Sequence, residues 1–150
     1  RRWFMFNFNS RGLYGSIFKE IPLSDFAKTI KKIPGTVIAL QRLPRSTEIV
    51  QLEDYLGRPI LDLTELNSDL EAMLALVSLL DEYVCVSNTN VHLRTSCGKR
   101  CHVLVPHPAE FRWMAEGNES PWFKNSRIYR QGMDGDWSGA LSQLAKALGP

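Results

Sequence analysis

The run Thr36-Val37-Ile38-Ala39-Leu40 most constrains what this chain can fold into. It is short, unbroken and rich in β-branched residues, which is typical of a parallel strand that is covered on both faces. Pro34-Gly35 precedes the run, and Gln41-Arg42 follows it. A chain that contains such a strand has to supply helices for both faces of a sheet.

Strand-like and helix-like segments alternate along the rest of the sequence. We expect strands at 1–8, 36–40, 59–63, 83–86, 101–105 and 126–130, and helices at 22–32, 46–56, 69–80, 89–97 and 136–148. A polar turn is expected at 9–12 and a long irregular stretch at 107–125. This spacing predicts βαβ units with right-handed crossovers. The predicted fold class is α/β: one domain, residues 1–150, with a doubly wound, Rossmann-like parallel sheet and helices on both faces.

The strongest helical pattern follows the capping sequence Asn67-Ser68-Asp69. Its apolar residues recur at helical spacing, so we expect all of them in the core. They are Leu70, Met73, Leu74, Val77 and Leu80.

Composition excludes several classes of function. The net charge is +2 and the basic residues are scattered, which argues against a nucleic-acid partner. No apolar run has the length of a membrane span. The segment Arg1–Phe6 is too short for a signal peptide, so we expect a cytoplasmic location.

Neither a metal nor a redox cofactor is indicated. The three cysteines, Cys85, Cys97 and Cys101, are an odd number and are predicted to be buried thiols. Cys97 and Cys101 with His92 lack the spacing of a usual zinc site. The Gly-x-Gly-x-x-Gly signature is absent, so a nicotinamide or flavin cofactor is not supported.

A polar cluster directly after the predicted strand 83–86 is the main candidate site. Asn88 or Thr89 can cap the next helix and leave nearby N–H groups free for phosphate oxygens. His92 lies on the same helical face as both. The alternative is that these residues only cap the helix and that His92 bonds to the neighbouring backbone. The residues alone leave both possibilities open.

Other predicted strand ends contribute polar groups to the same edge of the sheet. They carry Asn9, Ser10 and Arg11; Gln41 and Arg42; and the stretch 107–113. Two guanidinium groups among them could pair with phosphate. The set lacks a nucleophile with its base and a pair of converging carboxylates, so a hydrolase is not favoured.

The run 80–93, followed by Gly98-Lys99, resembles the nucleotide-sugar-binding half of GT-B glycosyltransferases. It is most similar to the heptosyltransferase-like domains at the carboxyl end of many bacterial tetratricopeptide-repeat proteins. Further pieces occur in the same order in that group. They are Arg112-Trp113, Ser120-Pro121-Trp122-Phe123, Tyr129-Arg130-Gln131 and Asp136-Trp137. The resemblance covers roughly residues 37–148.

The resemblance implies roles for individual residues. The family's strand-end motif is Asp-Thr with a later His, and the matching positions here are Ser87, Asn88 and His92, so a serine replaces the acid. Phosphate binding is implied for Asn88, Thr89, Asn90 and His92.

Residues outside this motif have implied roles as well. Gln41 resembles the residue near the nucleotide base or ribose, and Ser10 and Arg11 resemble the loop that supplies a cation to the diphosphate. Arg112 is a further candidate for a phosphate or carboxylate contact. For the aromatic residues around it, packing of the long loop is the favoured interpretation.

A GT-B enzyme uses two Rossmann-like domains, and the donor is held mainly by the second. The resemblance therefore implies a domain that binds a nucleotide-diphosphate sugar and that needs an acceptor-binding domain or a tetratricopeptide-repeat partner for sugar transfer. One alternative is a non-catalytic scaffold module that keeps the fold without the donor. Another is an unrelated α/β domain that binds a small molecule. The sequence assigns no catalytic residue, nucleotide or sugar.

Overall fold

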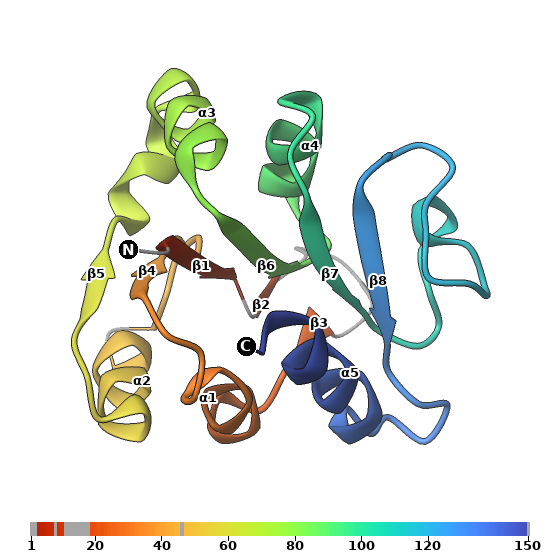
Figure 1. Cartoon of the computed structure of the whole chain (residues 1–150), viewed down its shortest axis with the longest axis horizontal. Coiled ribbons are helices and arrows are strands. Elements are labelled where there is room, and N and C mark those ends of the chain that lie inside the picture. Colours follow the sequence, from red (N-terminus) through yellow and green to blue (C-terminus); the bar gives the residue numbers. More distant parts are fainter. Residues whose placement is uncertain (1–2, 8, 11–18, 46, 150) are drawn as a thin grey trace.

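A six-stranded parallel sheet forms the centre of the computed structural model, which describes residues 3–7, 9–10, 19–45 and 47–149. The strands follow the order β5-β4-β1-β6-β7-β8 (Figure 1). Their bounds are β1 Trp3–Asn7, β4 Thr36–Ala39, β5 Ile60–Asp62, β6 Glu82–Val86, β7 Cys101–Val105 and β8 Ser126–Arg130. The chain thus moves outward from β1 to one edge and then from β6 to the other. This is the predicted doubly wound order.

Helices cover both faces of the sheet, as predicted. One face carries α1 Leu23–Ile30, α2 Glu48–Leu56 and α5 Ser138–Leu148, and the other carries α3 Leu70–Leu79 and α4 Thr89–Ser96 (Figure 1). Each layer has its own apolar core, because successive residues of β4, β6 and β7 point to opposite faces. Within the described ranges, none of the helices has the length and apolar character that a membrane span requires.

Local sequence signals explain where several helices begin and end. The Asp69 carboxylate accepts a hydrogen bond from the Ala72 amide at 3.0 Å and caps α3. Gly57 ends α2 in the left-handed conformation, with a φ of 67°. The core prediction for α3 is right for Met73, Val77 and Leu80.

The same prediction is wrong for Leu70 and Leu74, which are 64% and 39% exposed. The sheet and α4 cover only a narrow stripe of α3, so the apolar residues outside this stripe face outward. Periodicity shows that a helix is amphipathic, but it does not show how wide the covered stripe is.

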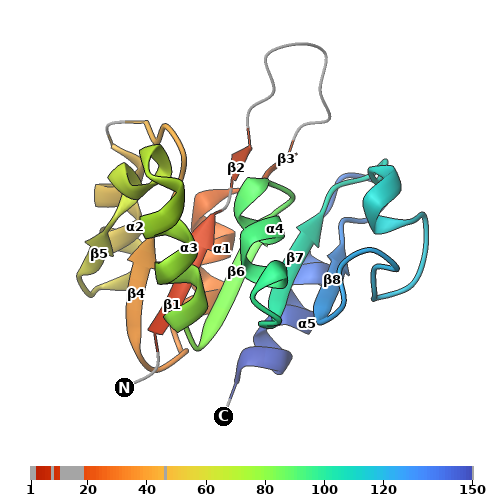
Figure 2. The same cartoon turned by 90° about the horizontal axis from the view of Figure 1, so that it is seen from above.

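The polar turn predicted at 9–12 is a second difference. Asn9–Ser10 forms β2, which pairs antiparallel with β3 Lys19–Glu20. This two-stranded element lies beyond the end of β1, at the carboxyl edge of the main sheet (Figure 2). The 3₁₀ helices η1 Thr64–Ser68 and η2 Phe111–Trp113 were also not predicted.

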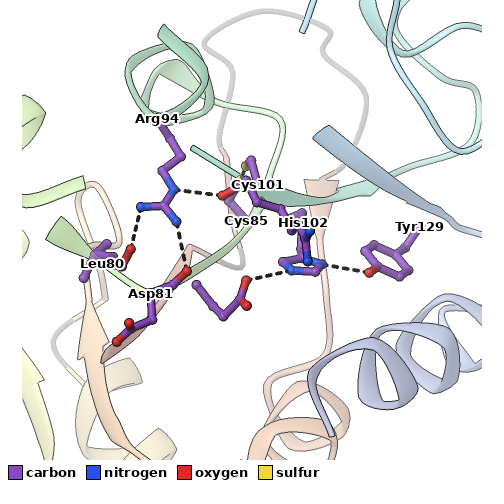
Figure 3. Close-up of polar contacts among 9 residues, drawn as sticks. Leu80, Asp81, Cys85, Arg94, Cys101, His102 and Tyr129 are labelled. Carbon is purple, nitrogen blue, oxygen red and sulfur yellow. Dashed lines mark hydrogen bonds and ion pairs between the residues drawn. The ribbon is translucent and has the colours of Figure 1, made fainter. Parts of the chain in front are cut away.

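A buried arginine joins α4 to the end of α3 (Figure 3). The Arg94 guanidinium donates to the carbonyl oxygens of Val77 at 2.5 Å, Leu80 at 2.8 Å and Asp81 at 3.1 Å, and its Nε donates to that of Arg100 at 2.8 Å. Burial lowers the pKa of Arg94. The cation therefore satisfies carbonyl groups at a helix end that would otherwise lack partners.

A second buried network crosses β6, β7 and β8. The His102 ring bonds through Nδ1 to the Tyr129 hydroxyl at 2.7 Å and through Nε2 to the Glu82 carboxylate at 3.0 Å (Figure 3). The hydrogen bond with His102 lowers the pKa of Glu82, although burial opposes this effect. Burial raises the pKa of Tyr129 to about 12. The network joins Glu82 and His102, near the amino ends of β6 and β7, to Tyr129, the fourth of the five residues of β8.

Two of the thiols are buried as predicted. Cys85 and Cys101 are fully buried on neighbouring strands, with their sulfur atoms 3.6 Å apart, whereas Cys97 is only half-buried. Burial raises the pKa of the Cys85 thiol well above its usual value. Thiols with this environment are poor nucleophiles.

Replacing Arg94 by methionine is expected to destabilise the protein strongly. The change leaves buried carbonyl groups unpaired and should lower the free energy of unfolding by about 3 kcal/mol in urea denaturation. Arg42→Met, at an exposed position, is the matched control and should change it by less than about 0.5 kcal/mol. Equal effects of the two substitutions would contradict the role given to Arg94.

Glu82→Gln is expected to reduce stability in a pH-dependent way. Because the pKa of Glu82 is lower in the folded protein, its carboxylate stabilises the fold above the unfolded-state pKa of about 4.3, and this contribution is lost as the pH falls through the folded-state value. The difference in melting temperature between wild type and variant should therefore be largest near neutral pH and shrink in acid. Glu119→Gln, at an exposed carboxylate, should show no such trend.

Candidate functional site

β4 and β5 lie on one side of β1, and β6, β7 and β8 lie on the other, so the strand order reverses between β1 and β6. Open α/β sheets bind ligands at such a switch point. In folds of this type the ligand lies outside the carboxyl ends of the strands. Ser87 and Asn88 directly follow β6, and the antiparallel pair of β2 and β3 follows β1. The structure thus places the main sequence-predicted site at the switch point of the sheet.

Asn88 caps α4, which decides between the two residues, Asn88 and Thr89, that the sequence offers for this role. It has an extended backbone with a φ of −155°, and its Oδ1 accepts a hydrogen bond from the Val91 amide at 3.3 Å. The Tyr83 hydroxyl donates to the same oxygen at 3.5 Å. Within the described residues, the Asn88 Nδ2 is buried and has no partner. This donor is available to an acceptor only if its surroundings open.

A charged cluster lies beside Ser87. The Ser87 hydroxyl donates to Glu110 Oε2 at 3.0 Å, and the Arg112 guanidinium donates to the same oxygen at 2.5 Å. Lys19 forms an ion pair with the other carboxylate oxygen and lies 3.5 Å from the Ser87 carbonyl oxygen. Burial lowers the pKa of Lys19, and the positive charge of Arg112 lowers it further. We call Lys19, Ser87, Glu110 and Arg112 the carboxylate cluster.

The carboxylate cluster is held in place by the crossover 106–125 between β7 and β8. Arg130, at the end of β8, donates to the carbonyl oxygens of Met114 at 2.9 Å and Gly117 at 2.7 Å. The Ser120 hydroxyl donates to the Arg112 carbonyl oxygen at 2.9 Å. The crossover backbone next to Glu110 and Arg112 is therefore anchored to β8 and to itself.

His92 lies on α4 next to this crossover. Its ring makes an edge contact with the Phe123 ring, with 4.7 Å between the ring centres. Burial lowers the pKa of His92, and the charge of Arg112 lowers it further. Both effects favour the neutral imidazole, which can donate or accept a hydrogen bond.

The remaining candidates next to Ser87 differ in their surroundings. Thr89 is exposed in the first turn of α4. Asn90 is buried, and its Nδ2 donates to Asn67 Oδ1 at 3.4 Å. The Asn67 amide in turn donates to the Leu40 carbonyl oxygen at 3.2 Å. Asn90 therefore connects α4 to the carboxyl end of β4.

The candidates from the other strand ends are only partly described. Gln41 is buried at the end of β4, and its Nε2 lies 3.5 Å from the Arg42 carbonyl oxygen. Ser10 lies in β2, and its side chain is not described; Arg11 lies outside the described residues. Lys19 of β3, the strand that pairs with β2, is a cation that the structure does describe in this part of the chain.

The aromatic residues of the crossover support the packing interpretation in part. Trp113 is fully buried, and its ring centre lies 5.3 Å from that of Phe123. Trp122 is 56% exposed and Phe111 is 71% exposed, and their rings are in edge contact. Packing therefore explains Trp113, whereas the Phe111–Trp122 pair lies on the surface.

Lys19 was not among the sequence-predicted site residues, and Glu110 was included only as part of the strand-end stretch 107–113. Lys19 stands far from any motif, because its place beside Ser87 depends on the pairing of β2 with β3. Glu110 lies in the irregular stretch 107–125, two positions before the predicted Arg112. A carboxylate close to a predicted phosphate-binding arginine was the one signal that could have drawn attention to it.

Chemically, the carboxylate cluster is suited to binding an anion. It combines two cations and a hydroxyl, and the amino end of α4 follows directly. Among the described residues, no group of three His, Cys, Asp or Glu side chains is placed to hold a metal ion. An open pocket of about 590 Å³ near Arg100 and Arg127 lies at the opposite, amino edge of β7 and β8. The topological position favours the switch point over that pocket.

Comparison with known proteins yields a likeness at the level of the fold. No model of a known protein family matches the sequence, and no curated protein matches it. The crystal structure of the glycosyl transferase family 9 from Veillonella parvula DSM 2008 is similar over 98% of this chain, with a TM-score of 0.61 and 13% sequence identity. The chain spans 38% of the length of that protein. The likeness agrees with the predicted fold, a Rossmann-like half of a GT-B protein.

The coupling between His92 and Arg112 can be tested by titration. Arg112→Gln removes the neighbouring positive charge and is expected to raise the pKa of His92, measured from the chemical shift of its ring protons by NMR. Arg42→Gln, at an exposed position outside the carboxylate cluster, should leave this pKa unchanged. An unchanged His92 pKa in Arg112→Gln would show that the two groups do not interact.

Proposed function

We propose that residues 1–150 form one domain that binds the diphosphate of a nucleotide sugar, as the donor-binding half of a glycosyltransferase-like protein. Sugar transfer would require a second domain or a partner chain that holds the acceptor. Such a partner could be joined to tetratricopeptide repeats, as the sequence resemblance implies. We expect the domain alone to be inactive in transfer.

The observation that carries this proposal is the arrangement at the carboxyl end of β6. Lys19 and Arg112 converge on Glu110 beside Ser87, and α4 begins immediately after it. A diphosphate offers the negative charge and the acceptor oxygens that such a set of donors requires. The similarity in fold to the glycosyl transferase from Veillonella parvula supports the same proposal.

In this proposal each residue around Ser87 has its own role in binding the nucleotide sugar. Thr89 offers a hydroxyl beside the amino end of α4, and neutral His92 donates a hydrogen bond to a phosphate or sugar oxygen. Asn88 orders the backbone amides of the first turn, and Asn90 fixes this turn to β4. We assign Gln41 to the side of the nucleoside, and Ser10 and Arg11 to the loop over the diphosphate.

A non-catalytic scaffold module is the second candidate. It is favoured by the serine at position 87, where the resembled motif has an acid, and by Glu110, whose carboxylate already neutralises part of the positive charge. In a scaffold this ion-pair network would only hold the crossover to the sheet. The two candidates differ in whether any nucleotide sugar binds.

A thermal-shift experiment decides between them. UDP-, GDP-, ADP- and CMP-linked sugars are tested at millimolar concentration. A ligand at one hundred times its dissociation constant stabilises the fold by about 2.7 kcal/mol, which corresponds to a rise in melting temperature of about 5–10 °C for a domain of this size. At least one nucleotide sugar is expected to produce such a rise.

Variants show where on the protein the nucleotide sugar binds. His92→Ala and Thr89→Ala should reduce the ligand-induced rise by at least half. Ser142→Ala, on the exposed side of α5 and across the sheet, should preserve it. The donor-binding proposal fails if no nucleotide sugar changes the melting temperature, and the scaffold candidate then stands.

A further inference from the structure

We propose that Glu110 is an internal substitute for the anion: its carboxylate occupies the phosphate position between Lys19 and Arg112 and is exchanged for phosphate oxygens when a ligand binds. This inference builds on the proposed function, because it assigns a closed state to the same site. An anion then binds only if its interaction with Lys19 and Arg112 is more favourable than that of the Glu110 carboxylate.

The first argument is the number of donors on one carboxylate. Both oxygen atoms of Glu110 are occupied: one by Lys19, the other by the Ser87 hydroxyl and the Arg112 guanidinium. Two cations and a hydroxyl on a single oxyanion are a set of partners that a phosphate also takes. The side chains of Lys19 and Glu110 are only 14% and 13% exposed, so solvent screens this ion pair weakly.

The second argument is a surplus of donors near the carboxylate cluster. In the described part of the chain, Arg112 Nε and Asn88 Nδ2 are buried without a hydrogen-bond partner. Buried donors of this kind are uncommon in folded proteins and call for an explanation. Glu110 already has three partners, close to the roughly four hydrogen bonds that a carboxylate can accept, whereas a diphosphate has more acceptor oxygen atoms.

The third argument concerns how the exchange can occur. Arg130 and Ser120 anchor the crossover on the carboxyl-terminal side of Glu110 through several carbonyl groups. The exchange that we propose is a rotation of the Glu110 side chain, with this anchored backbone left in place. With Glu110 in place, the cluster has two positive charges and one negative charge. When the carboxylate has rotated away, both positive charges are available to a phosphate.

The test measures binding of inorganic pyrophosphate by calorimetry. Glu110→Gln keeps the shape of the side chain and removes its charge, so pyrophosphate should bind at least about tenfold more tightly than to the wild type. Glu119→Gln removes an exposed carboxylate of the same crossover and should change the affinity by less than about twofold. Adding Lys19→Met to Glu110→Gln should abolish the gain.

Equal or weaker binding of pyrophosphate by Glu110→Gln overturns the inference, because Glu110 would then be a ligand contact or a structural group. If circular dichroism shows that this variant does not fold, Glu110→Ala takes its place. A crystal structure of the wild type with pyrophosphate is an independent measurement. Separation of Lys19 from Glu110 in it supports the exchange, and an intact ion pair beside bound pyrophosphate overturns it.

Nucleotide sugars separate this inference from the proposed function. If Glu110→Gln gains affinity for pyrophosphate but no nucleotide sugar binds more tightly than pyrophosphate, the exchange stands and donor binding fails. If a nucleotide sugar binds wild type and Glu110→Gln equally well, donor binding stands and the exchange fails.

Discussion

The reversal of the sheet at β1 is the constraint on which the rest of this molecule depends. The chain first builds β4 and β5 on one side of β1 and then returns to build β6, β7 and β8 on the other. Right-handed crossovers place α1 and α2 on one face and α3 and α4 on the other, and α5, which follows the last strand, returns to the face of α1 and α2. The connections that leave β1 and β6 therefore diverge, and polar groups at the two strand ends meet between them.

Polar contacts secure this framework away from the switch point. Arg94 holds α4 against the last turn of α3, and the Glu82–His102–Tyr129 network joins β6, β7 and β8. Both groups are buried and hydrogen-bonded, as polar groups in an interior have to be. Neither network includes a residue of the carboxylate cluster.

The candidate site at the carboxyl edge is rich in donors and holds one shared carboxylate. Lys19, Arg112 and Ser87 come from three separate segments and meet on Glu110. This arrangement is compatible with both candidate functions. The ion pairs with Glu110 can be a ligand site in its closed state, or they can be a lasting structural contact in a scaffold. The difference between the two lies in the free energy of exchanging the carboxylate for phosphate.

The sequence by itself determined the order and the type of the main elements, since periodicity, caps and short apolar runs are local properties. It also determined the strand-end position of Ser87 and Asn88 and limited the cap of α4 to Asn88 or Thr89. Only the tertiary structure decided which stripe of α3 is covered, that 9–10 pairs with 19–20, and that Glu110 lies between Lys19 and Arg112. Lys19 and Ser87 are 68 residues apart, so no local pattern encodes their contact. The physical reason is that the folding of the sheet, and not the sequence near either residue, brings the ends of β1 and β6 together.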